Sequence, residues 1–211
     1  MSAARRSSSR APSRVARPAR APLAPSKPDV AALERFLQSL GVDSSRNQEY
    51  AVTAALLSEL LAEYTSGLRE ERPMLRPLAY SGRPGEIVCV EGITVYGLCP
   101  HHLVPYLGEA RVRYTPKEQV SGAGAMVRFV RDLARVPRLQ EDLTQAIADG
   151  VHDFLEPAGV EVWMRARHLC MELRGSGSRA RLVTEARRGD GLPPTASGEP
   201  GSARAPRHPA R

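Results

Sequence analysis

Apolar residues recur at helical spacing in several stretches of the chain and alternate with polar residues in others. Leucine and phenylalanine side chains follow a three-to-four-residue period over residues 30–40 and 51–64, which predicts two N-terminal helices. The same period predicts a helix over residues 124–135. Another helix is predicted to open at Pro137, where a proline suits the first turn, and to run to Leu155.

Strand patterns fill the gaps between these helices. Residues 87–96 are rich in Val, Ile and Thr, and residues 107–115 alternate apolar with polar side chains, so they predict a pair of strands. A second pair is predicted over residues 160–173 and 179–186. Two strand pairs that flank a helix pair predict an α+β domain with an antiparallel sheet.

Composition divides the 211 residues into three segments. Residues 1–28 carry seven basic groups and no acid, and residues 187–211 are rich in Pro and Gly. Both are predicted to be disordered tails, because they contain too little apolar surface to bury. Residues 29–186, with 18 basic and 21 acidic groups, are long enough to form one domain with its own core.

Charge and composition exclude several classes of protein. The net charge of +7 belongs to the tails, so the mildly acidic body shows no nucleic-acid footprint. No apolar run is long enough to span a membrane. Three cysteines are too few for a disulfide scaffold, and their odd number favours a reducing compartment, the cytoplasm. The acid-free N-terminus leaves two alternatives to a plain tail, an organelle transit peptide and a polyanion-binding arm.

The residues with the most distinctive chemistry form two short clusters. One is Cys99-Pro100-His101-His102, and the other is His168-Leu169-Cys170, at the end of a predicted strand. Thiolate and imidazole are ligands that Zn²⁺ prefers, and two Cys with one His would leave one tetrahedral position open, as in catalytic sites. The two remaining histidines would then be proton shuttles, because imidazole titrates near neutral pH.

Spacing alone leaves other interpretations of these clusters open. One alternative is that these are unrelated buried or loop residues. The other is that Cys99 and Cys170 form a disulfide. Cys89 lies within an apolar strand pattern and is predicted to be a small core residue.

The chain resembles the GTP cyclohydrolase I family at these residues. The family's Cys-x-His-His-x-x-x-x-x-Gly segment reads CPHHLVPYLG here, from Cys99 to Gly108, and is followed by the family's Val, Tyr and Pro in RVRYTP. Further on, the family's patterns match PRLQEDLTQAIADGV and then PAGVEVWMRARHLCMELRG. The resemblance covers about residues 33–189, and the motifs occur in the family's order and spacing.

This resemblance implies a fold and an activity. The fold would be the tunnelling fold, with antiparallel strands and two helices packed on one face of the sheet. Subunits would join into a ring-shaped homo-oligomer, a decamer in the typical enzyme, with active sites between subunits. The reaction would open the imidazole ring of GTP, release formate and give 7,8-dihydroneopterin triphosphate.

The resemblance also implies a role for each site residue. The zinc ligands would be Cys99, His102 and Cys170, and the acid/base pair would be His101 and His168. The guanine edge would be held by Gln140 and Glu141, because a carboxylate can accept from guanine N1–H and its 2-amino group. The triphosphate would face Arg128 and Arg174, whose forked side chains bind two oxygens at once.

The chain departs from the family where the triphosphate is held. The family's Gly-Leu-Ser-Lys reads Gly122-Ala123-Gly124-Ala125 here, so two polar contacts are missing. Arginines at 128, 138, 179 and 181 are available to compensate. The sequence therefore favours a zinc GTP cyclohydrolase, with three alternatives: a related hydrolase of a less phosphorylated purine, a non-catalytic paralogue, and a nucleic-acid protein that binds through its tails.

Overall fold

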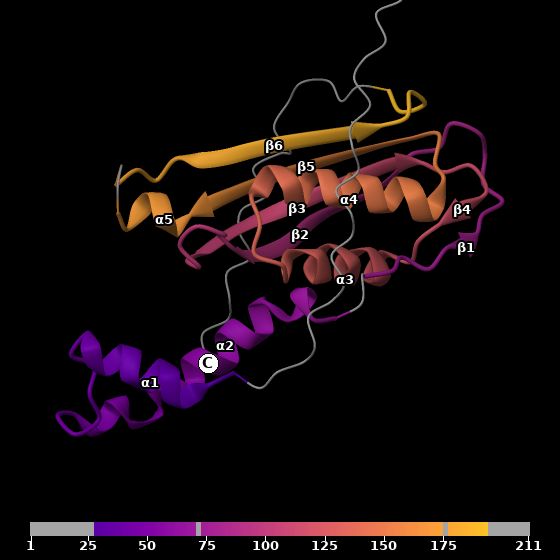
Figure 1. The fold of residues 1–211 in the computed structure, drawn as a ribbon. Coiled ribbons are helices and arrows are strands. Elements are labelled where there is room, and N and C mark those ends of the chain that lie inside the picture. The colour runs from indigo at the N-terminus through magenta and orange to yellow at the C-terminus, as the bar shows by residue number, and fades with distance from the viewer. Residues whose placement is uncertain (1–27, 71–72, 175–176, 194–211) are drawn as a thin grey trace, which may run out of the picture.

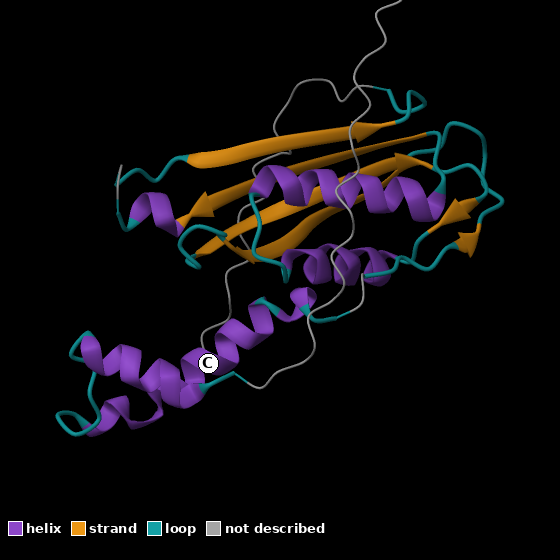
Figure 2. Cartoon of the chain, in the orientation of Figure 1, coloured by secondary structure: helices purple, strands orange, loops and turns teal. Residues whose placement is uncertain are grey.

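The computed structural model describes residues 28–70, 73–174 and 177–193, and the predictions for the remainder of the tails lie outside these residues. The described chain has two parts, a pair of N-terminal helices and a larger body in which helices pack on a sheet (Figures 1 and 2). The predicted α+β class is confirmed. The helices are α1 (Val30–Ser39), η1 (Gln48–Val52), α2 (Thr53–Tyr64), η2 (Ser66–Leu68), α3 (Ala123–Ala134), α4 (Gln140–Leu155) and α5 (Leu169–Glu172).

The body is organised around a four-stranded antiparallel sheet with strand order β2-β3-β5-β6. Its strands are β2 (Val88–Leu98), β3 (Pro105–Thr115), β5 (Gly159–His168) and β6 (Arg181–Arg188). A short separate pair, β1 (Leu78–Ala79) and β4 (Gln119–Val120), lies beside one end of the sheet (Figure 1). The register places Tyr106 opposite both Gly97 and His168, so one row of residues crosses three strands at the other end.

Helices α3 and α4 cover one face of the sheet (Figure 1). Alternate residues of each strand point toward these helices and are buried with their apolar stripes, as the period-two and period-3.6 patterns require. The completely buried members of this core include Val95, Val112, Met126, Val130, Leu143, Ile147, Val151, Val162 and Met164. Two helices on one face of an antiparallel sheet is the arrangement that the resemblance implied.

The opposite face of the sheet carries charged and aromatic side chains. Glu161 is only 5% exposed and pairs with arginines at 111, 113 and 187, while Trp163 lies between two arginine side chains. Cys89 pairs in register with Arg113 on this face and is exposed. The prediction that Cys89 belongs to the core is therefore wrong, because the residue falls on the polar side of the pleat.

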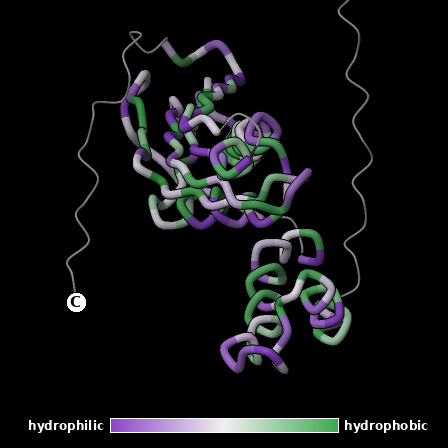
Figure 3. Tube along the Cα trace, turned by 90° about the vertical axis from the view of Figure 1, so that its left-hand side faces the viewer, coloured by the Kyte–Doolittle hydropathy of each residue, from purple (hydrophilic) through white to green (hydrophobic). Residues whose placement is uncertain are grey.

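Helices α1 and α2 form a hairpin that projects from the body (Figures 1 and 3). It joins the body through the ion pair of Glu63 with Arg135, at 3.0 Å, and through the Gly67 amide, which donates to the Arg135 carbonyl. Much of its apolar stripe remains exposed within one chain, including Phe36, Leu40, Val52, Leu56 and Leu60. The two predicted helices are present, but their apolar stripe is not covered by the body.

Three boundaries differ from the predicted ones. The helix expected to open at Pro137 begins at Gln140, because Arg138 donates its backbone amide to Leu98 and holds the preceding segment extended. The strand expected over 160–173 ends at His168, and one turn of helix follows. Strand β6 runs to Arg188, two residues beyond the end predicted for this strand, and Leu192 is buried. Along the described residues, no helix combines the length and apolarity needed to cross a membrane.

Candidate functional site

The turn between β2 and β3 presents the first cluster of thiol and imidazole groups. It spans six residues, from Cys99 to Val104, and it is closed by two backbone hydrogen bonds between Cys99 and residues 103 and 104. Leu103 adopts a positive φ of 50°, a conformation that is uncommon outside glycine and is found often at functional sites. The tight turn buries Cys99 and leaves His101 and His102 exposed.

Cys170 reaches the same place from α5. Strand β5 pairs with the beginning of β3, so its end at His168 lies beside this turn, and the helical turn that follows carries Cys170. The Cys99 thiol, the His102 imidazole and the Cys170 thiol then lie with their ligand atoms within 4.8 Å of one another. Because β2, β3 and β5 all contribute, we call this end of the sheet the thiol end.

The donor set and its spacing fit a tetrahedral metal ion. Bonds of about 2.3 Å to sulfur and 2.05 Å to nitrogen place the two ligand atoms about 3.6 Å apart at a tetrahedral zinc. The distance from Cys99 Sγ to His102 Nδ1 in the structure is 3.6 Å. Burial, and then the neighbouring Cys99, raises the pKa of the Cys170 thiol, so a bound cation would be needed to favour the thiolate.

Both remaining histidines of the two clusters lie at the thiol end. His101 is exposed, and its Nδ1 is 3.9 Å from Cys99 Sγ. His168 is buried and stacks on the Tyr106 ring, with ring centres 4.9 Å apart and planes inclined by 21°. Burial lowers the pKa of His168, and the carboxylate of Glu141 acts in the opposite direction. One exposed and one buried imidazole therefore flank the three ligand groups.

Gln140 is placed differently from its expected role at the guanine edge. It is the first residue of α4 and is completely buried. Its Nε2 donates to the Met164 and Leu182 carbonyls, at 3.2 and 3.1 Å, and its Oε1 lies 2.9 Å from His168 Nε2. The side chain therefore binds the sheet and His168 rather than facing an open site.

Glu141 and Arg174 lie near the ligand group, and both are exposed. Glu141 follows Gln140 in the first turn of α4, and its carboxylate contributes to the raised pKa of Tyr106 as well as acting on His168. Arg174 follows α5, and its charge partly offsets the effect of burial and of Cys99, which raise the pKa of the Cys170 thiol. Both side chains are therefore available to a molecule that binds at the thiol end.

Arg128 is not brought to this group within one chain. It lies in α3, which begins at Ala123 beside β4, at the other end of the sheet (Figure 1). The eleven residues of β3 separate the two ends by roughly 30 Å. We call this second region the α3 end. It also contains Gly124 and Ala125, and a Cβ placed on Gly124 would lie 3.7 Å from Arg128 Nη1.

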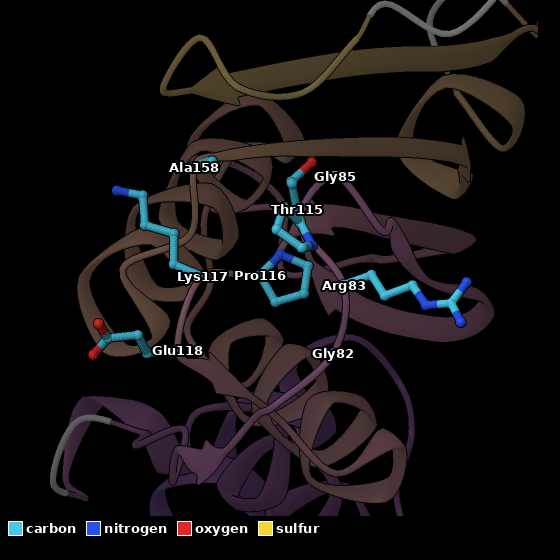
Figure 4. A pocket seen from close by; sticks show the side chains of 9 residues that line it. Gly82, Arg83, Gly85, Thr115, Pro116, Lys117, Glu118 and Ala158 are labelled. Atoms are coloured by element: carbon cyan, nitrogen blue, oxygen red, sulfur yellow. The ribbon is translucent and has the colours of Figure 1, made fainter.

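A pocket of about 300 Å³ opens elsewhere, between the segment before β2, the β3–β4 turn and Ala158 (Figure 4). Its walls include Arg83, Thr115 and Lys117. Thr115 is the last residue of β3, so this pocket lies at the opposite end of that strand from the thiol groups. It contains none of the predicted site residues.

Sequence reasoning missed Tyr106 as a site residue. Its ring is completely buried against His168, and burial raises the pKa of its hydroxyl to about 12. Gly97 makes room for it, because a Cβ there would lie 2.3 Å from the ring. The strand predicted over residues 107–115 begins after Tyr106, whereas a strand that includes Pro105 as an edge residue places Tyr106 on the inward face.

Known proteins are similar to this chain over a range that includes the residues of the site. The family model described as "GTP cyclohydrolase I" matches residues 30–192. The protein named "GTP cyclohydrolase 1" from Geobacillus kaustophilus is 38% identical over 160 residues, which are 75% of this chain and 85% of that protein. Proteins of the same name from Aquifex aeolicus and Bacillus subtilis are 36% and 35% identical, each covering 75% of this chain and 84% of their own length.

Proposed function

The chain belongs to the GTP cyclohydrolase I family of enzymes, and from that premise we propose that it opens the imidazole ring of GTP in a zinc-dependent reaction. The products would be formate and 7,8-dihydroneopterin triphosphate. The observation that carries the proposal is the group of Cys99, His102 and Cys170, with two further histidines beside it. Thiol ligands favour a reducing compartment, so we place the reaction in the cytoplasm.

The metal site would be held by the two thiolates and the His102 imidazole. A zinc ion in such a three-ligand site supplies a water molecule whose pKa is near neutrality. C8 of a purine is a poor electrophile until N7 is protonated, and an imidazolium can supply that proton. His101 and His168 flank the ligand group and would serve as the acid and the base.

Substrate selection would rest on the exposed residues of the thiol end. The Glu141 carboxylate can accept hydrogen bonds from guanine N1–H and the 2-amino group, a pair of donors that adenine lacks. Arg174 would bind a phosphate oxygen, because guanidinium groups match phosphate geometry. Both side chains are exposed, and their charges act on groups of the thiol end.

Arg128 would reach the substrate only from a neighbouring subunit. Within one chain its guanidinium lies near Gly124 in the first turn of α3, toward the end of the sheet opposite the ligand group. A homo-oligomeric ring with sites between subunits would bring the two ends together. The exposed apolar side chains of α1 and α2 support such an assembly, because a stripe of this kind is normally covered.

One observation favours a second candidate substrate. Gly124 and Ala125 stand where the family has Ser and Lys, and each lost charged contact costs about 1.5–3 kcal/mol. A purine with fewer phosphates would lose less from this change than GTP. The alternative activity is therefore the same ring opening on GMP or guanosine.

A turnover assay tests both candidates. Zinc-loaded protein is incubated with GTP, GMP and guanosine in parallel, and formate and the pterin absorbance are followed with and without a chelator. Chelator-sensitive product from GTP is the expected result. Product from GMP or guanosine but not from GTP would support the second candidate substrate instead. If zinc-loaded protein gives no product from any of the three, the proposed ring-opening activity is contradicted.

A further inference from the structure

We propose that Gln140 is a positioning residue that fixes which ring nitrogen of His168 carries the proton. In this arrangement Nε2–H donates to Gln140 Oε1, and Nδ1 keeps its lone pair. The kinetic consequence rests on the proposed function, whereas the proton position does not. The inference replaces the role at the guanine edge that the sequence implied for Gln140.

The orientation of the Gln140 amide follows from its acceptors. Its Nε2 lies 3.2 Å from the Met164 carbonyl oxygen and 3.1 Å from the Leu182 carbonyl oxygen. A carbonyl oxygen can only accept, so the amide atom that faces these two groups must be the NH₂ nitrogen. The amide oxygen is therefore the atom that faces His168.

A chain of hydroxyl groups supports the same orientation. Gln140 Nε2 also lies 3.0 Å from Thr184 Oγ1, so its two protons are shared among three acceptors, and the hydroxyls of Thr184 and Thr144 are 2.6 Å apart. Thr144 Oγ1 donates to the Gln140 backbone carbonyl at 2.8 Å. Its proton is thus committed, so Thr184 donates to Thr144 and presents a lone pair to Gln140.

The proton on His168 then has one consistent position. Gln140 Oε1 is an acceptor 2.9 Å from His168 Nε2, so that nitrogen must be the donor. The Tyr106 ring stacks on the His168 imidazole, with the planes inclined by 21°, and restricts the plane of that ring. Because Gln140 is completely buried, water does not compete for either bond. The imidazole is held in one plane and one tautomer before any substrate binds.

The proton position can be measured without turnover. Magic-angle-spinning NMR of the sedimented protein, labelled with ¹³C and ¹⁵N in histidine, distinguishes the two neutral tautomers. His168→Gln identifies the His168 signals by their loss. We expect them to report the Nε2–H form in the unmodified protein. A His168 signal of the Nδ1–H form would overturn the proposal, whether or not the protein turns over GTP.

A pair of matched variants tests the role of Gln140 in the reaction. Gln140→Met keeps the length of the side chain and removes both hydrogen-bonding functions, and Gln145→Met makes the same change further along α4, where the side chain accepts from Arg188 instead. We expect Gln140→Met to lower kcat by about 10- to 100-fold with little change in KM, the range found for residues that orient a reacting group. It should also lose the single-tautomer signal.

The alternative role predicts a different pattern. If Gln140 holds guanine, Gln140→Met raises KM and leaves the His168 spectrum unchanged, which would overturn the proposal. Gln145→Met should leave the spectrum and both constants unchanged. If the unmodified protein shows the Nε2–H form but no turnover of any purine, the proposed function fails while the positioning of His168 stands.

Discussion

The thiol end and the α3 end of the sheet are built in opposite ways. At the thiol end, Cys99 comes from one segment and His168 and Cys170 come from a second, and they are fixed by a tight turn, a strand register and the buried Gln140 amide. At the α3 end, small residues stand at 122–125, and Arg128 is exposed. The groups proposed for bond breaking and Arg128, which is proposed to hold phosphate, therefore belong to separate elements. Changing one set need not disturb the other.

The largest effect should come from a ligand of the thiol end. Cys170→Ser is expected to lower bound zinc, measured by atomic absorption, and to lower turnover by about 10³-fold or more, because water without the metal has a pKa near 15.7 rather than about 7. Cys89→Ser is the matched control, since that thiol is exposed on the other face of the sheet. Full turnover in metal-free Cys170→Ser protein would contradict the metal mechanism.

Substitution of a histidine at the thiol end should show whether proton transfer can be lost while metal binding is kept. His168→Ala is expected to retain zinc and to slow formate release by about 10²-fold or more, the contribution typical of a positioned acid or base. His152→Ala serves as the control, because that histidine lies in α4 beside Asp153. An unchanged rate in His168→Ala would remove this residue from the chemistry.

Restoring the family's residues at the α3 end should improve binding. Gly124→Ser with Ala125→Lys is expected to lower KM for GTP by about 10-fold or more, since a hydrogen bond to a charged group contributes about 1.5–3 kcal/mol. Gly124 can accept a side chain, because an added Cβ meets only Arg128 at 3.7 Å. Steady-state kinetics with guanosine are the control. An equal change for guanosine would show that these positions do not contact phosphate.

The smallest expected effect is on the free energy of unfolding, when one glycine at each end is replaced by alanine. Gly97→Ala should lower the free energy of unfolding by about 1–3 kcal/mol, because its Cβ would lie 2.3 Å from the Tyr106 ring. Gly124→Ala should raise it by about 0.4–1 kcal/mol, since alanine restricts the unfolded chain and its Cβ meets only Arg128 Nη1, at an ordinary contact distance of 3.7 Å. Urea denaturation measures both. Equal values would mean that the two ends are packed alike.

Local pattern was sufficient to predict most of the fold. Hydrophobic periodicity located α1, α2, α3 and all four strands of the sheet, because each buries a regular stripe. It failed where a tertiary contact decides the boundary: the Arg138 amide bonds to β2, so α4 begins three residues after Pro137. It also misplaced Cys89, since an apolar run does not reveal which face a helix will cover.

The site was predictable in its residue types but not in its contacts. The spacing of Cys99 and His102 suggested a shared ion, and the structure places Cys170 beside them through the pairing of β3 with β5. The contacts of Gln140 could not be predicted, because its partners are backbone carbonyls of Met164 and Leu182, which leave no signature in the sequence. In the sequence, a glutamine with a buried amide cannot be distinguished from one whose amide binds a ligand. The distinction requires the positions of those two carbonyls in the structure.

Under the proposed function, activity requires the correct register of the row formed by Gly97, Tyr106 and His168. Side chains alternate between the two faces, so a slip of β5 by one residue would turn His168 to the far face and put Arg167 or Leu169 against the helices. Such a subunit could remain compact and yet have no catalytic activity. In refolding experiments, recovered activity would therefore count correctly registered chains, whereas recovered helix content would also count misfolded ones.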